Sequence, residues 1–212
     1  IVNWDPVAKT TLADIDTERV ERETELVYIK YPLKEAVDGV EFISVATTRA
    51  ETMLGDTAVI VHPKDERYTK LIGKTIILPI TNREIPIITS ERVEKEFGTG
   101  VVKLTPAHSY DDYVMMSEWN RANPQSTVGY INVIDKDGKM TGPIPEKFKK
   151  LSTIEAREKV EQDLGNMLLK REKHLQSVMV GERSRAVIEQ IMSSQWFIDV
   201  EKLKQPAIDA VK

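Results

Sequence analysis

The stretch Phe97-Gly-Thr-Gly-Val-Val-Lys-Leu-Thr-Pro-Ala-His-Ser-Tyr-Asp-Asp-Tyr113 joins a glycine turn, a strand and a helix start. Its alternating pattern predicts a strand over residues 101–105. Lys103 and Thr105 then share one face of this strand, and Pro106 ends it because proline cannot continue the hydrogen-bonded ladder.

A helix is expected to start directly after this strand. Ser109 is a favourable N-cap, and Asp112 three residues later has the spacing of a capping box. The strand end and the helix start therefore bring a lysine, a threonine and a carboxylate together, at a place where binding groups often lie. The alternative is that His108, Ser109 and Asp112 only cap a helix and that Lys103 is solvated.

The composition describes a globular protein and excludes several classes. The chain has 212 residues, 41% of them hydrophobic and 30% charged, which is enough to bury a core. Its formal charge of −4 argues against a nucleic-acid binder held mainly by bulk charge. The chain has no cysteine, and its three histidines lack metal-ligand spacing, so we expect no metal and no cofactor. No apolar run approaches the ~18 residues of a membrane span, and the start at Ile1 reads as part of a longer protein.

A second polar stretch follows an expected strand end. Alternation predicts strands over 26–31 and 40–47, paired as a hairpin with a long connection. Directly afterwards come Thr47, Thr48, Arg49 and Glu51. Their hydroxyls and backbone N–H groups could bind a ribose, a phosphate or a carbonyl, whereas the alternative is a second capping box made by Thr48 and Glu51.

The remaining elements are short, and the two chain ends look different from the middle. The clearest helix is expected over 151–164, with Ser152 and Glu155 as a capping box. Residues 1–17 are expected to be irregular. Further predicted segments are helices over 63–72, 90–96 and 109–120, strands over 58–61, 74–78, 84–88 and 128–134, and a tight turn over 135–140.

This order of elements predicts a mixed α+β fold. Many short strands separated by short helices favour a closed or half-closed β-barrel with peripheral helices. The core is expected over residues 40–170. Residues 1–39 and 171–212 are then two ends of one connecting arm, because they are irregular and carry apolar tips.

Several segments together resemble the editing domain that is inserted in valyl-tRNA synthetases. The resemblance covers nearly the whole chain and follows the family's order. The matching segments are Val2-Asn3-Trp4, the run from Thr47 to Val59, His62-Pro63, Asp65 to Tyr68, Leu71 to Lys74, Arg83 to Ile87, Phe97 to Gly100, Thr105 to His108, Ile131 to Val133, Asp137 to Lys139 and Ser194-Gln195-Trp196-Phe197.

This resemblance implies post-transfer editing, that is, hydrolysis of threonine esterified to valine tRNA by a positioned water without a metal. Its implied partners are the 3′ acceptor end of tRNA(Val) carrying threonine and the rest of the valine–tRNA ligase chain. That ligase is expected to bind ATP and to be cytoplasmic, and no membrane is expected as a partner. The alternative is a non-catalytic module that binds the acceptor end through a degenerate editing site.

The resemblance also implies roles for individual residues. Asp112 matches the aspartate that binds the substrate amino group. Lys103 and Thr105 match residues at the reaction centre. The implied substrate-binding residues are Thr47, Thr48, Arg49, Glu51, Phe97, His108, Ser109 and Asp111.

Two positions depart from the family pattern. Ser109 stands where the family usually has an aspartate that recognises the threonine hydroxyl; serine can still bind a hydroxyl, or Asp111 could substitute. The Cys-x-x-Cys knuckle of many relatives is replaced by Gly181-Glu182-Arg183-Ser184. The chain also lacks the signature motifs of the synthetic site, so this segment alone is not expected to activate valine.

Overall fold

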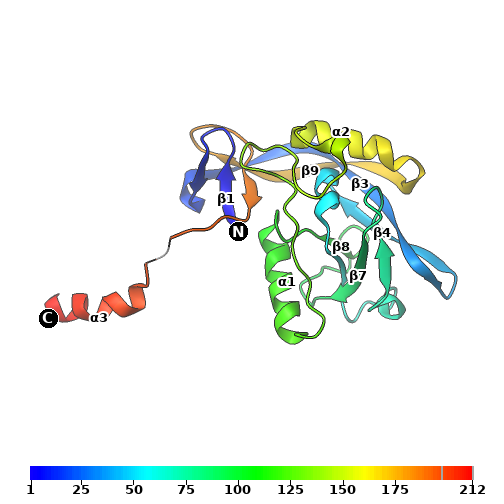
Figure 1. The fold of residues 1–212 in the computed structure, drawn as a ribbon, viewed down its shortest axis with the longest axis horizontal. Helices are drawn as coiled ribbons and strands as arrows, with labels where there is room; N and C mark the ends of the chain where they lie inside the picture. The colour runs from blue at the N-terminus through cyan, green and yellow to red at the C-terminus, as the bar shows by residue number, and fades with distance from the viewer. Residues whose placement is uncertain (197, 212) are drawn as a thin grey trace.

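The computed structural model describes residues 1–196 and 198–211 and confirms the mixed α+β fold. A strongly curled seven-stranded sheet forms a half-barrel, flanked by two helices and a separate three-stranded sheet (Figure 1). Phe197, the last residue of one predicted motif, lies outside the described residues. Among the described residues, no helix is long and apolar enough to cross a membrane.

The curled sheet combines pairs of consecutive strands, β3 with β4 and β6 with β7, with strands that are distant in sequence. Its order is β4-β3-β6-β7-β5-β8, with β9 also paired to β3, and only β5 and β7 are parallel. The strands are β1 Val2–Asp5, β2 Thr10–Leu12, β3 Thr17–Val37, β4 Val40–Thr47, β5 Ala58–Val61, β6 Thr75–Ile77, β7 Glu84–Thr89, β8 Val101–Leu104, β9 Leu168–Gly181 and β10 Glu189–Ile191. The α-helices are α1 Tyr110–Ala122, α2 Thr153–Leu164 and α3 Val200–Val211, and short 3-10 turns lie at Asp14–Asp16, Ala50–Gly55, Thr69–Leu71, Glu146–Phe148 and Gly165–Met167.

The 21-residue strand β3 connects the parts of the molecule. Its first part forms a two-stranded ribbon with β9, and its later part pairs with β4 and β6 in the curled sheet. The β3–β4 hairpin is confirmed, but the predicted long connection is wrong. Asp38 and Gly39 alone make the turn, both with positive φ, as a tight two-residue hairpin turn requires.

The hydrophobic core lies inside the curled sheet. Val27, Ile29 and Tyr31 of β3 are almost completely buried there, so the core extends N-terminally beyond residue 40. Although β4 and β8 are at opposite ends of the hydrogen-bonded order, the curl brings them side by side. Polar groups at the ends of these two strands therefore meet.

The two helices of the body begin as the sequence predicts, with one difference. The capping box of Ser152 and Glu155 at the start of α2 is confirmed. At α1, Ser109 accepts a hydrogen bond from the Asp112 backbone N–H at 3.2 Å. The predicted return bond is replaced, because the Asp112 carboxylate accepts from the Thr105 N–H at 2.7 Å.

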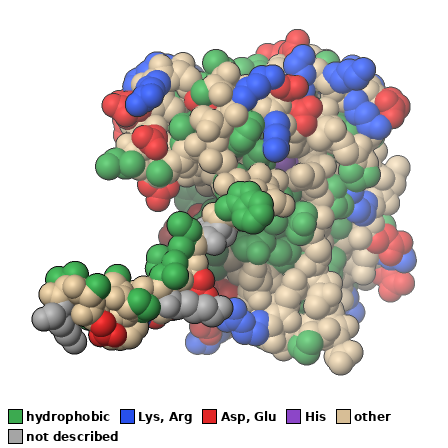
Figure 2. All heavy atoms as spheres, turned by 60° about the vertical axis from the view of Figure 1, so that its left-hand side comes forward, with side chains coloured by type: hydrophobic (Ala, Val, Ile, Leu, Met, Phe, Trp, Pro, Cys, Tyr) green, Lys and Arg blue, Asp and Glu red, His purple; other side chains and the backbone are tan. Residues whose placement is uncertain are grey.

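Several weaker predictions are wrong, because long-range contacts decide those segments. The first 17 residues are not irregular: β1 pairs with β10 and β2. The predicted helix over 63–72 is reduced to one 3-10 turn, and residues 90–96 form turns. Residues 128–134 form no ladder strand, and helix α3 was not predicted. Figure 2 shows that the chain end bearing α3 projects from the body, with hydrophobic side chains along it.

Candidate functional site

A polar pocket of about 410 Å³ lies where the ends of β4 and β8 meet, beside the β3–β9 ribbon. Most of the residues singled out in the sequence line it together. These are Thr47, Thr48, Arg49, Phe97, Lys103, Thr105, His108, Ser109 and Asp112. The ribbon contributes Leu26, His174 and Gln176 to the same wall.

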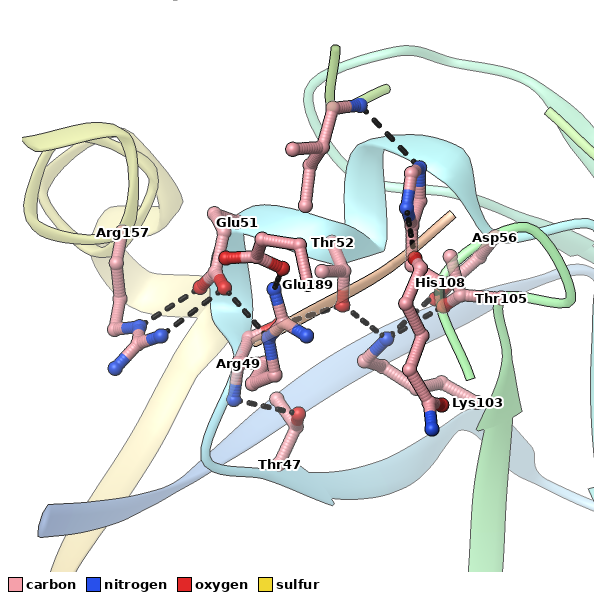
Figure 3. A network of polar contacts seen from close by, with 12 residues as sticks. Thr47, Arg49, Glu51, Thr52, Asp56, Lys103, Thr105, His108, Arg157 and Glu189 are labelled. Atoms are coloured by element: carbon pink, nitrogen blue, oxygen red, sulfur yellow. Dashed lines mark hydrogen bonds and ion pairs between the residues drawn. The ribbon is translucent and has the colours of Figure 1, made fainter. Parts of the chain in front are cut away.

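Lys103 is held at the pocket floor by three partners. Its Nζ donates to Thr105 Oγ1 at 2.6 Å, to Thr52 Oγ1 at 2.7 Å and to Asp56 Oδ1 at 3.3 Å (Figure 3). An ammonium has three N–H donors, so all three are used. The bond to Asp56 is the longest of the three, and it pairs the ammonium with a buried carboxylate.

Asp56 lies beneath this floor and has no exposed surface. Its carboxylate accepts from the hydroxyls of Tyr31 at 2.7 Å and Thr105 at 2.6 Å, besides Lys103. Burial raises the pKa of Asp56, while Lys103 and the hydroxyl donors oppose this effect. The Thr105 hydroxyl consequently donates to Asp56 and accepts from Lys103, which fixes its direction.

Asp112 supplies the carboxylate of the pocket. Only 9% of the residue is exposed, and burial raises its pKa to about 6, against the opposing effect of Lys103 and the bond from the Thr105 N–H. At neutral pH this carboxylate is mostly ionised. It is a desolvated negative charge that gains from a cationic ligand group.

His108 is fixed by backbone groups on both sides of its ring. Nε2 accepts from the N–H groups of Val133 at 2.9 Å and Ile134 at 3.3 Å, so Nδ1 carries the proton and donates to the Gln190 carbonyl at 3.1 Å. Burial, aided by Arg49 and Lys103, lowers the pKa of His108 to about 4. Neither ring nitrogen is free for substrate or for proton transfer, so the ring positions the neighbouring loops.

Arg49 belongs to a buried ion-paired network (Figure 3). It contacts Glu51 at 3.0 Å and Glu189 at 2.7 Å, and Arg157 of α2 also binds Glu51 at 2.7 Å. Burial alone would lower the pKa of Arg49, but the two glutamates raise it. The predicted capping box of Thr48 and Glu51 is wrong, because the Glu51 carboxylate is used by the two arginines and the 3-10 turn has no side-chain cap.

Phe97 stands at the pocket mouth on a glycine-rich loop. Its side chain is 59% exposed and meets the His174 ring edge-on, with 6.4 Å between ring centroids. Gly100 has φ +72°, and a Cβ there would lie 2.5 Å from Arg67 Nη2 and 2.6 Å from the Lys95 carbonyl. This turn therefore requires glycine, and the turn presents the aromatic ring to the pocket.

Two predicted residues lie outside the pocket lining. Glu51 is completely buried behind Arg49. Asp111 is exposed and faces a different hollow, with Gln190 and Trp196. Of the two residues considered for recognising a hydroxyl, only Ser109 lines the pocket.

Sequence reasoning missed Thr52, Asp56, Arg157, Glu189 and Gln190. Thr52 and Asp56 follow Thr47 and Thr48 closely, so their place in the same polar stretch was an available signal. Arg157, Glu189 and Gln190 had none, since they reach the site from 80 to 140 positions away in the chain.

The pocket combines an anion for a cationic group, a buried ammonium, several hydroxyls and an exposed aromatic ring. Such a set suits a small ligand that has both an amino group and polar oxygens. In the described residues, no three histidine, aspartate or glutamate side chains come close enough together to hold a metal ion.

The fold and the pocket define an α+β domain with a half-barrel sheet and a pocket lined by polar side chains. The chain is related over its whole length to one segment of the valine–tRNA ligases, which are aminoacyl-tRNA synthetases. It is 47% identical to valine–tRNA ligase of Carboxydothermus hydrogenoformans over 99% of this chain and 23% of that protein. It is 42% identical to the Francisella tularensis enzyme, over 100% of this chain and 22% of that protein. The chain is 46% identical to the Listeria monocytogenes enzyme, over 100% of this chain and 23% of that protein.

The chain thus spans less than a quarter of the length of the curated relatives it matches. No protein-family model matches it.

Proposed function

We propose that this chain is the post-transfer editing domain of a cytoplasmic valine–tRNA ligase and that it hydrolyses threonine from mischarged tRNA(Val). The observation that carries the proposal is the position of the Asp112 carboxylate beside Lys103 in a hydroxyl-lined pocket. The relationship to valine–tRNA ligases supplies the reaction class. The partners would be the 3′ acceptor end of the tRNA and the rest of the ligase chain.

The need for such a site follows from the similarity of threonine and valine. In this enzyme family an apolar pocket is known to reject threonine only about a hundredfold. A second pocket made of polar groups reverses the preference, because valine leaves those groups without partners. In this chain Ser109 and the threonine hydroxyls at the pocket wall would receive the substrate hydroxyl.

Binding of the aminoacyl group would be directed by charge. Asp112 would accept the α-ammonium group, and the desolvated carboxylate makes this contact favourable. Thr47, Thr48 and Arg49 would hold the terminal ribose and the ester, with Phe97 against the adenine. These contacts fix the carbonyl carbon within reach of a water molecule.

Hydrolysis would then proceed by direct attack of water on the ester carbonyl. The bond between the carbonyl carbon and the ribose oxygen breaks, and a proton from the water ends on that oxygen, which releases threonine and uncharged tRNA. Lys103, paired with Asp56 at the pocket floor, would stabilise the developing negative charge on the carbonyl oxygen. Thr105, oriented by Asp56, supports Lys103.

The domain organisation is also part of the proposal. The editing core would be centred on residues 40–170 together with the buried part of β3. The rest of residues 1–39 together with residues 171–212, which include most of the β3–β9 ribbon, would lead to the rest of the ligase.

The test is deacylation of threonyl-tRNA(Val) and of valyl-tRNA(Val) by the full-length ligase that carries this chain. We expect rapid loss of threonine only, and Asp112→Ala should reduce it by at least about a hundredfold because the amino group loses its counter-charge. Glu158→Ala, which removes an exposed carboxylate on α2, is the matched control and should keep the wild-type rate.

Loss of neither amino acid, in an enzyme that still charges valine normally, would refute the hydrolase. The pocket would then serve only to bind the acceptor end, as the replacement of the family aspartate by Ser109 allows. A separate Asp111→Ala variant identifies the hydroxyl sensor, since selectivity should survive this change if Ser109 performs that role.

A further inference from the structure

The three-residue strand β10 contacts both walls of the pocket. Glu189 Oε2 accepts from Arg49 Nη2 at 2.7 Å. The Gln190 carbonyl accepts from His108 Nδ1 at 3.1 Å, and its side-chain oxygen accepts from the Tyr110 backbone N–H at 2.7 Å. Neither Glu189 nor Gln190 lines the pocket itself.

Each contact holds a segment that carries pocket residues. Arg49 continues the stretch of Thr47 and Thr48 at the end of β4. Tyr110 opens α1, whose first turn carries Asp112. The first N–H groups of a helix have no partner within the helix, so the Gln190 side chain satisfies a donor that would otherwise be unpaired.

The strand itself is held firmly. β10 pairs with β1, from Val2 with Ile191 to Trp4 with Glu189, and Ile188 and Ile191 are buried on either side of the two polar residues. Glu189 is only 5% exposed. A buried carboxylate is tolerated only when it is paired, so Glu189 and Arg49 constrain each other's position.

We infer that Glu189 and Gln190 are positioning residues that fix the distance between the Arg49 wall and the α1 wall of the pocket. The sheet β10-β1-β2, which joins strands from both ends of the chain, is then part of the support of the site. That this support serves an editing reaction rests on the proposed function.

The kinetic test uses the full-length ligase with Glu189→Ala or Gln190→Ala. Displaced walls hold the aminoacyl end less well, so KM for threonyl-tRNA(Val) should rise and kcat/KM should fall by about tenfold to a hundredfold. Simple loss of folded protein would lower kcat and leave KM unchanged. Glu189→Gln and Gln190→Glu, which keep an acceptor oxygen, should restore most of the loss. Thr11→Ala on β2 of the same sheet is the control and should keep the wild-type KM.

A second measurement is independent of catalysis. The ring nitrogens of His108 report the geometry between the walls, so ¹⁵N NMR of the labelled chain should show shifted ring signals in both alanine variants and unchanged signals in Thr11→Ala. Wild-type KM values in both alanine variants would overturn the inference. If the wild-type enzyme removes no threonine, the proposed function fails, and unshifted His108 signals would then overturn the positioning role separately.

Discussion

At the scale of single residues, burial in the pocket shifts the pKa values of two titrating groups in opposite directions. Burial favours the neutral form of each, so it raises the pKa of Asp112 to about 6 and lowers the pKa of His108 to about 4. Asp112 is therefore the group that changes charge just below neutral pH. His108 stays neutral at neutral pH, because its pKa lies near 4.

The raised pKa of Asp112 predicts a pH-dependent stability. The unfolded chain loses this proton near pH 3.8 and the folded protein near 6, so between these values the folded state binds more protons. The free energy of unfolding contributed by Asp112 is then present in full at low pH and falls as the pH rises through 6. Asp112→Asn does not titrate and keeps an acceptor for the Thr105 N–H. Its stability relative to wild type should therefore rise by on the order of 2 kcal/mol between pH 4 and pH 7.

Urea unfolding of both proteins across this pH range measures the difference. The contribution of His108 cancels because both proteins contain it. Thr11→Ala, which changes no titrating group, is the control and should show a flat difference from wild type. An equally flat difference for Asp112→Asn would contradict the pKa shift.

At the scale of elements, predictions from local sequence patterns were correct where neighbouring residues determine the conformation. The capping box at Ser152 and Glu155 and the alternation of β3 and β4 are properties of neighbouring residues. These features were therefore readable from the sequence, apart from the length of the β3–β4 connection.

Segments whose hydrogen bonds go to distant partners were misjudged. The N–H groups of Val133 and Ile134 bond to His108, so an alternating apolar segment does not become a ladder strand. The candidate site follows the same division. Its lysine, threonines and Asp112 stand in two recognisable stretches, whereas Glu189 is joined to Arg49 across 140 positions and no local pattern points to it.

The start of α2 gives a prediction at this scale. Ser152 Oγ accepts from the Glu155 N–H at 3.3 Å, and the Glu155 carboxylate accepts from the Ser152 N–H at 2.8 Å. Ser152→Ala removes the first bond and should cost about 1 kcal/mol. For a domain of this size the Tm should fall by about 2–4 °C.

Calorimetry of Ser152→Ala and Ser152→Asn separates the cap from other effects. Asparagine is an equally good N-cap, so it should retain most of the stability. A Tm for the alanine variant equal to that of wild type would show that the cap contributes nothing here.

At the scale of the whole molecule, the body is a unit from which α3 is separate. The described residues of α3 are exposed, and the helix stands away from both sheets (Figure 1). Its apolar side chains Val200, Leu203, Ile208 and Val211 consequently add nothing to the core.

Ending the chain after Asp199, directly before α3, should therefore leave the body intact. We expect the Tm to change by less than about 1 °C, because the apolar side chains that the structure describes in α3 are exposed. Calorimetry on the two chain lengths measures this directly. A decrease of several degrees would mean that α3 packs against the body in solution.

The pairing of β3 with β9 has a consequence for the order in which the molecule is built. Thr17 pairs with Gly181, so at a synthesis rate of about 5–20 residues per second, β3 leaves the ribosome roughly 10–30 s before its partner. During this interval the early part of β3 is an unpaired edge, the kind of surface on which nascent chains aggregate. Because β10 is made later still, a ribosome that stalls before residue 189 would release a chain with most of its curled sheet and an unfinished pocket.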